Sequence, residues 1–384
     1  MQPSNLHNPA PRWRRLHADS IVWILHDHFY HRLDANLRML RGGVTAKVAV
    51  PVGDLAIYND SQGSPGAKPR RGVGHDSLRA GACHEARHGK PPPEHDREFY
   101  ERTLAQTEGW AKESLLRLER ARRLYESRPD RFILAHRVAD VVRAQRQGKA
   151  AVFLGFEGCK AFEGRIELLH VFHRLGVRQM QLTWSNPNQL VAVARSSGAW
   201  TLSAFGCEAV AAMNELGIVI DLAHAPWSLL ADVVARSRHA VIVSHASPAD
   251  AHPGSGDMTA QHLDALKSCG GLLGLHFCRH YINGPAATFD DFLDTIDYLV
   301  ERGYEDLIAL GGDLFEDDSY FRARHGPPGG ATHETWKVFI DELSDIARIP
   351  NVTRGLVSRG YPTRLIKRIL GGNAMRVYRA ILGG

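Results

Sequence analysis

The sequence of 384 residues lacks the features of several specialised protein classes. No apolar run approaches the roughly 18 residues of a membrane-spanning helix, and the N-terminal MQPSNLHNPAPRWRR has no apolar core of a signal peptide. We therefore expect a cytoplasmic protein that binds no membrane. Its 47 Lys and Arg against 42 Asp and Glu leave a net charge of only +5, too small over this length to indicate nucleic-acid binding.

Cysteine is scarce, and several motifs are missing. The chain has five cysteines, none in a CxxC spacing, which argues against a zinc ribbon and a disulfide framework and favours a reducing compartment. There is no GxGxxG after the first apolar run, no GxxxxGK[ST] and no GxSxG. Nucleotide binding and serine-hydrolase chemistry therefore lose their usual support.

The chain does contain an ordinary globular composition, with 44% hydrophobic and 23% charged residues. Short apolar runs alternate with helical patterns over most of its length. The predicted strands are 20–25, 132–135, 150–155, 177–183, 218–222, 240–244, 271–276 and 307–312. The predicted helices are 98–128, 138–147, 166–175, 207–216, 226–237, 260–268, 289–302 and 334–347. This alternation is typical of parallel α/β proteins, and a strand count near eight favours a closed (β/α)₈ TIM barrel over an open sheet.

The domain organisation follows from this pattern. We expect an N-terminal extension over 1–19 and one barrel domain over 20–384. Within it, residues 59–96 are rich in Gly, Pro, His and Arg, and they predict a long loop inserted after the first strand. This loop would lie on the active-site face, either as a flexible insertion or as a basic lid. Its arginines that could bind an anionic group are Arg70, Arg71, Arg79 and Arg87.

Ionisable side chains stand at the ends of several predicted strands, and these are His26, His28, Glu157, His224, His245 and Asp313. The C-terminal ends of barrel strands meet at one face, so these side chains should gather there. Residues i and i+2 of a strand project to the same side, so His26 and His28 can bind one ion. Any single histidine could instead be a capping or surface residue. Together, buried ionisable groups require a compensating charge, and the set suffices for two divalent metal ions bridged by Glu157.

Several motifs occur in one order along the chain: GFEGCKAF, LGVRQMQLTWSNPN, GCEAVAAMNELGIVIDLAHAP, VIVSHASP, CGGLLGLHF, LGGDLFEDD and GGNAMRVYRAIL. This series resembles the strand-end motifs of the membrane (renal) dipeptidase family of the metal-dependent amidohydrolase superfamily. The resemblance implies a TIM-barrel hydrolase with two zinc ions that cleaves dipeptides and, in some members, dehydropeptides and β-lactams. It also implies a possible homodimer.

The resemblance assigns roles to individual residues. His26 and His28 would bind one metal ion, His224 and His245 the other, and Glu157 both. A water molecule activated between the metal ions would be the nucleophile, and Asp313 would act as general base and then as general acid.

The chain also departs from the family pattern at four places. The family's His-x-Asp ligand pair is His-Asp-His here, and Phe315 replaces the second aspartate of the family's GxDFDG segment. Trp184 stands where the family has a histidine that polarises the substrate carbonyl, and His276 or His280 is the candidate replacement. Gly256 aligns with the arginine that holds the substrate carboxylate. Trp184, Gly256 and His276 are therefore the predicted substrate-contacting positions, and we expect weak activity on ordinary dipeptides.

Three functions remain open from the sequence. The first is a binuclear zinc hydrolase that cleaves an amide or peptide bond in a small dipeptide, a modified dipeptide or another peptide-derived substrate. The second is a hydrolase of a lactone, ester or cyclic amide at the same site. The third is a non-catalytic binding protein descended from such a barrel. Nitrogen and oxygen ligands suit zinc, but also manganese, iron or cobalt.

Overall fold

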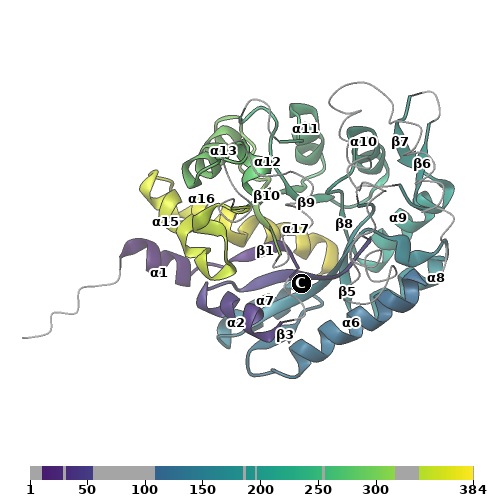
Figure 1. Cartoon of the computed structure of the whole chain (residues 1–384), viewed down its shortest axis with the longest axis horizontal. Coiled ribbons are helices and arrows are strands. Elements are labelled where there is room, and N and C mark those ends of the chain that lie inside the picture. The colour runs from purple at the N-terminus through teal and green to yellow at the C-terminus, as the bar shows by residue number, and fades with distance from the viewer. Residues whose placement is uncertain are drawn as a thin grey trace, which may run out of the picture.

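The structure is a computed structural model that describes residues 11–28, 32–54, 109–184, 187–194, 197–252, 256–315 and 337–383. Its strands surround a central axis, and the helices form an outer ring (Figure 1). Among the described residues, eight parallel strands close into a barrel. In ring order they are β1 (Trp23–Asp27), β2 (Ala46–Gly53), β4 (Ala150–Glu157), β5 (Val177–Gln181), β8 (Val219–Asp221), β9 (Ile242–Ala246), β10 (Leu272–His276) and β11 (Ile308–Leu314). Pairing of β11 with β1 completes the ring, which confirms the predicted (β/α)₈ barrel.

One barrel strand was not predicted, and one predicted strand lies outside the ring. The segment 132–135 forms β3 (Phe132–Leu134), which pairs with β4 at the edge of the sheet and is not a barrel strand. The missing member is β2, whose apolar run is interrupted by Lys47 and Pro51. The tertiary structure explains how β2 accommodates both residues. Lys47 forms a buried ion pair with Asp27, and Pro51 lies where the pairing register of β2 and β4 shifts.

The position of β2 corrects the placement of the predicted insertion. Residues 59–96 come after the second barrel strand, because β2 ends at Gly53. The prediction that they follow the first strand was wrong. The segment itself and its four arginines lie outside the described residues.

Helices precede or follow most strands. The α-helices are α1 (Arg12–Ala18), α2 (Leu33–Arg41), α6 (Trp110–Glu126), α7 (Val138–Arg146), α8 (Ile166–Arg174), α9 (Ala204–Leu216), α10 (Trp227–Arg236), α11 (Ala260–Ser268), α12 (Arg279–Asn283), α13 (Phe289–Glu301), α15 (Pro350–Ser358), α16 (Thr363–Lys367) and α17 (Asn373–Leu382). Shorter elements are the turns η1 (Lys160–Phe162), η2 (Asp341–Leu343), η3 (Ile346–Arg348) and η4 (Arg368–Gly372), and the hairpin β6 (Val191–Val193) and β7 (Trp200–Leu202). None of the helices in the described ranges is long and apolar enough to cross a membrane.

The helix predicted over 334–347 is wrong in its described part. Residues 337–347 contain only the 3₁₀ turns η2 and the start of η3. The backbone there pairs with the chain that follows β10: Arg279 N donates to Val338 O, and Ile340 N donates to Phe277 O. Because these amide and carbonyl groups bond to a distant segment, they are not used within a helix.

Aromatic side chains close the barrel at the end where β1 begins, and the N-terminal helix packs on the barrel's outer ring. The ring centroid of Trp23 lies 5.1 Å from that of Phe153 and 4.6 Å from that of Tyr378, which α17 contributes. In α1, buried His17 lies 2.7 Å from Thr353 Oγ1 and 2.9 Å from Gly42 O. Part of the predicted N-terminal extension is thus joined to the barrel by buried hydrogen bonds.

Candidate metal centre

His26 lies near the C-terminal end of β1, and His28 directly follows the strand. His26 is fully buried, whereas the His28 side chain is 25% exposed. Their Nε2 atoms are 3.1 Å apart. The two rings therefore present nitrogen atoms to the same space, as the i, i+2 spacing on a strand requires.

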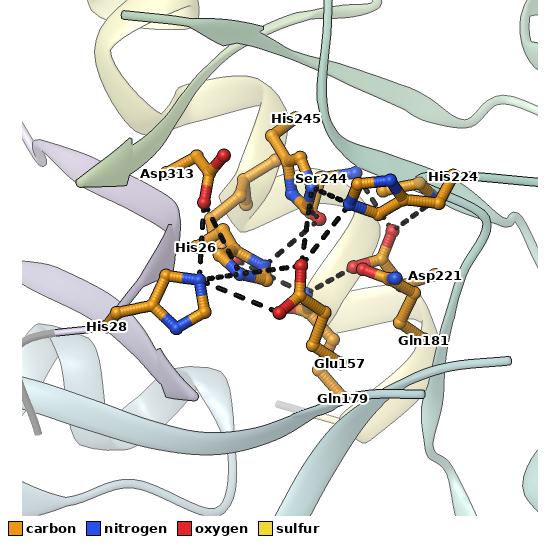
Figure 2. Close-up of polar contacts among 12 residues, drawn as sticks. His26, His28, Glu157, Gln179, Gln181, Asp221, His224, Ser244, His245 and Asp313 are labelled. Atoms are coloured by element: carbon orange, nitrogen blue, oxygen red, sulfur yellow. Dashed lines mark hydrogen bonds and ion pairs between the residues drawn. The ribbon is translucent and has the colours of Figure 1, made fainter. Parts of the chain in front are cut away.

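Glu157, at the end of β4, lies among the histidines, and Figure 2 shows its carboxylate between His28 and His224. One oxygen, Oε1, is 3.3 Å from His224 Nε2 and 3.9 Å from the Nε2 atoms of His26 and His245. The other oxygen, Oε2, is 3.7 Å from His28 Nε2. The two carboxylate oxygens thus face histidines from opposite sides of the cluster.

Two of the site residues have unusual backbone conformations. His224 has φ +65° and Asp313 has φ +55°, which is the left-handed region that residues with a side chain rarely adopt. Each such residue costs on the order of 1–3 kcal/mol and persists only when its surroundings hold it. His224 follows β8, and its Nε2 lies 3.0 Å from His245 Nε2. The strained backbone turns each of these side chains toward the centre of the cluster.

Asp313 joins the first-strand pair to a further histidine. Its Oδ1 is 3.3 Å from His28 Nε2 and 3.9 Å from His26 Nε2. Its Oδ2 is 3.7 Å from Nδ1 of His276, which ends β10. The carboxylate therefore lies between the candidate ligands and one of the predicted substrate-contacting residues.

The donor set fits divalent cations. Three groups have ligand atoms within 4.8 Å of one another, and these are His26, His28 and Glu157; Glu157, His224 and His245; and His26, His245 and Asp313. Imidazole nitrogens and carboxylate oxygens are ligands of zinc and related metals. Because Glu157 belongs to two groups, it is suited to bind two ions at once. The third group makes Asp313 a possible ligand as well, a role the sequence did not predict for it.

The electrostatics of the cluster match this donor set. Burial lowers the pKa of His26 and of His245, which keeps both imidazoles neutral and able to bind a cation. Burial opposes ionisation of Glu157, but the hydrogen bond with His224 and the nearby histidines bring its pKa below the usual value. Burial also opposes protonation of His28, yet Asp313 and Glu157 raise its pKa to about 9. Cation binding by His28 would therefore displace a proton.

The predicted substrate-contacting residues differ in their surroundings. The Trp184 ring is buried, with its centroid 6.1 Å from that of His224. The His276 ring is stacked on Tyr281 at 4.4 Å, and its centroid is 5.1 Å from that of His245. Both therefore border the histidine cluster.

The other three positions singled out by the family comparison are packed against neighbouring groups. A Cβ atom on Gly256 would lie 2.5 Å from Pro248 O, and the glycine has φ +76°. The Phe315 ring packs on Phe339 at 4.9 Å, and the His280 ring is 5.6 Å from that of Tyr281.

Several buried polar residues behind the cluster were not predicted. Asp221 accepts hydrogen bonds from Gln179 Nε2 at 2.9 Å and from Ser244 N at 2.9 Å. Lys47 pairs with Asp27, which lies between the two first-strand histidines. Polar letters inside otherwise apolar strands, such as IVID and AKVAV, are the signal that would have identified them.

Comparisons with known proteins agree with this geometry. A family model described as membrane dipeptidase, peptidase family M19, matches residues 99–321, more than half of the chain. Dipeptidase tcpJ of Claviceps purpurea is 28% identical over 274 residues, which are 70% of this chain and 60% of that protein. Dipeptidase verJ of Clonostachys rogersoniana is 28% identical over 261 residues, which are 67% and 62% of the two chains. The chain thus spans about three fifths of the length of these relatives.

Solved structures support the fold independently. The crystal structure of an amidohydrolase from Pseudomonas aeruginosa superposes with a TM-score of 0.71 and 23% identity. The superposition covers 97% of this chain and 99% of the other. A similarity at this level of identity shows a shared barrel architecture.

Proposed function

We propose that this chain, which belongs to the membrane dipeptidase family, is a metal-dependent hydrolase that cleaves an amide bond in a small dipeptide-like substrate. One observation carries the proposal. The carboxylate of Glu157 has one oxygen 3.3 Å from His224 Nε2 and the other 3.7 Å from His28 Nε2. A single carboxylate with its two oxygens facing two sets of imidazoles is the arrangement needed to bridge two cations.

Zinc is the cation that the donor set supports best. His26, His28 and Glu157 would hold one ion, and Glu157, His224 and His245 would hold the second. Two cations held by these residues would supply a water molecule of lowered pKa and would polarise the scissile carbonyl. His26 and His245 contribute neutral imidazoles, because burial lowers the pKa of each.

Asp313 is our candidate for proton transfer. Burial opposes ionisation of Asp313, but the surrounding histidines, with the hydrogen bond from His28, keep its pKa well below the usual value, so the carboxylate is ionised and can accept a proton. Its Oδ1 lies 3.3 Å from His28 Nε2, and its Oδ2 lies 3.7 Å from His276 Nδ1. In this proposal Asp313 accepts a proton from the attacking water and returns it to the leaving amine.

His276 and Trp184 are our candidates for substrate binding. Stacking on Tyr281 fixes the plane of the His276 ring, and a fixed imidazole can donate a hydrogen bond to the substrate carbonyl. Trp184, beside His224, offers an apolar surface suited to a bulky or aromatic acyl group.

A second candidate, hydrolysis of a lactone, ester or cyclic amide, is favoured by the surroundings of Gly256. A Cβ atom at this position would collide with the backbone of Ser247 and Pro248, so position 256 has no room for the arginine that the family pattern places there. A substrate without a free carboxylate suits this position. Rates on dipeptides with free and amidated C-termini, compared with rates on neutral esters and lactones, distinguish the two candidates.

The proposal is tested with Glu157→Gln. The amide has only one acceptor oxygen and no charge, so we expect two zinc equivalents in the wild type, at most one in E157Q, and a loss of roughly a hundred- to a thousandfold or more in kcat. Glu208→Gln, on the exposed face of α9, is the matched control and should bind two equivalents. A wild type without cations, or full turnover by E157Q, contradicts the proposal.

A further inference from the structure

We infer that Ser244 is a positioning residue that orients one histidine of each metal site and so couples the two sites, an inference that rests on the proposed function. Ser244 lies on β9 directly before His245 and is fully buried. Its Oγ is 2.9 Å from His245 Nδ1 and 3.5 Å from His26 Nδ1. His26 belongs to β1, which is not a neighbour of β9 in the barrel, so one hydroxyl contacts histidines from two separate strands.

The opposite nitrogen of each ring faces the carboxylates. His26 Nε2 is 3.9 Å from both Glu157 Oε1 and Asp313 Oδ1, and His245 Nε2 is 3.9 Å from Glu157 Oε1. The ring centroids of the two histidines are 4.2 Å apart, with their planes inclined by 65°. Both rings therefore direct Nε2 toward the proposed cations and Nδ1 toward the serine.

This arrangement determines which tautomer each ring adopts. A neutral imidazole that binds a cation through Nε2 carries its proton on Nδ1, so both Nδ1 atoms are donors in the loaded protein. A serine oxygen has two lone pairs and can accept a hydrogen bond from each. Without that oxygen, two buried N–H groups would lose their acceptor, which disfavours the binding tautomer of both rings.

The serine is itself held in place by a chain of hydrogen bonds (Figure 2). Its backbone N donates to Asp221 Oδ1 at 2.9 Å, and Asp221 Oδ2 accepts from Gln179 Nε2 at 2.9 Å. Gln179 Oε1 in turn accepts from the hydroxyl of Tyr378 in α17. On the other side, Gly274 lies so close to Ser244 O that an added Cβ would collide with it. Because the Ser244 backbone is fixed, its hydroxyl offers the two rings one defined acceptor.

The first test compares Ser244→Ala with Ser114→Ala in the full-length protein by zinc titration against a chromophoric chelator. Ser114, in α6, is also fully buried, and its hydroxyl has no hydrogen-bond partner among the described residues, so S114A controls for the loss of a buried serine. Removing a group that orients metal ligands typically weakens binding about 10- to 100-fold. We expect that loss for both equivalents in S244A and for neither in S114A. Weakening of one equivalent alone, or of none, would overturn the coupling.

A second pair of variants removes the dependence on how well S244A folds. Ser244→Thr keeps a hydroxyl. Ser244→Val introduces a side chain of nearly the same shape as threonine but without the hydroxyl. We expect S244V to bind both zinc equivalents about 10- to 100-fold more weakly than S244T, with a changed visible absorption spectrum when cobalt replaces zinc. Equal affinities and spectra would mean that Ser244 is only structural, even if the wild type binds two ions. A wild type that binds no cation would instead overturn the proposed function together with this inference.

Discussion

At the scale of the residue, Gly256 shows how one position can limit the chemistry of a loop. Its φ of +76° is a conformation that favours glycine, and an added Cβ would lie 2.5 Å from Pro248 O and 2.7 Å from Ser247 O. Two separate obstacles, backbone strain and lack of space, therefore keep a side chain away from this position.

We predict that Gly256→Ala lowers the free energy of unfolding by about 2–5 kcal/mol, because left-handed strain of about 1–2 kcal/mol adds to overpacking of about 1–3 kcal/mol. Gly360→Ala is the matched control. Gly360 has φ +80° but no atom within 4 Å of an added Cβ, so only the strain should remain. Denaturant unfolding of both variants measures the difference. Equal losses would mean that the loop after β9 relaxes around the new methyl group.

At the scale of the element, β2 contributes more than a wall of the barrel. Directly after its last residue, Asp54 accepts a hydrogen bond from Lys160 N at 3.2 Å, which joins the end of β2 to the turn η1 that follows Glu157. The carboxylate is buried and its Oδ2 has no hydrogen-bond partner among the described residues. Burial raises the pKa of Asp54 to about 7, although Lys160 lowers it in part.

This shift predicts a pH dependence of stability. An aspartate has a pKa of about 3.9 in an unfolded chain, so between about pH 4 and 7 the folded protein binds more protons at Asp54 than the unfolded one. Stability from this group therefore falls as the pH rises through that window. Relative to Asp54→Asn, we expect the metal-free wild type to lose about 1 kcal/mol of unfolding free energy per pH unit.

Denaturant unfolding at several pH values measures this slope. Asp19→Asn, at an exposed position after α1, is the control and should keep the wild-type slope. A D54N variant with the wild-type slope would show that Asp54 is ionised throughout the window.

At the scale of the whole molecule, the proposed cations connect parts of the chain that are distant in sequence. The candidate ligands come from the ends of β1, β4 and β9 and from His224, three residues after the end of β8. Since an unfolded chain holds these groups apart, cation binding should stabilise the entire barrel rather than one loop.

We predict that each zinc ion at a free concentration of about 100 times its Kd adds about 2.7 kcal/mol to the free energy of unfolding. Thermal unfolding in chelator and in graded zinc concentrations provides the measurement. E157Q, which lacks the bridging carboxylate, should gain clearly less than E208Q. An unfolding midpoint that does not move with zinc in the wild type would contradict the linkage.

The barrel and the set of candidate ligands could both be predicted from the sequence alone. Alternating apolar strands and amphipathic helices are local patterns, and they predicted most elements because burial of one face depends on neighbouring residues in the chain. The barrel then required the strand ends to meet, so His26, Glu157, His224 and His245 could be grouped without coordinates. The six ionisable residues predicted at the strand ends do lie together in the structure.

Features that depend on partners distant in sequence could be seen only in the three-dimensional fold. The segment that forms β2 was not predicted as a strand because it contains Lys47. A charged lysine is acceptable in a buried strand only when a partner such as Asp27 neutralises it. The apolar spacing of 334–347 resembled a helix because its backbone bonds to residues after β10 could not be foreseen. The same holds for the contact of Asp313 with His276, the closed space at Gly256 and the hydroxyl of Ser244 between two histidines. Distances between side chains are set by packing of the whole barrel, and a local sequence pattern contains no information about them.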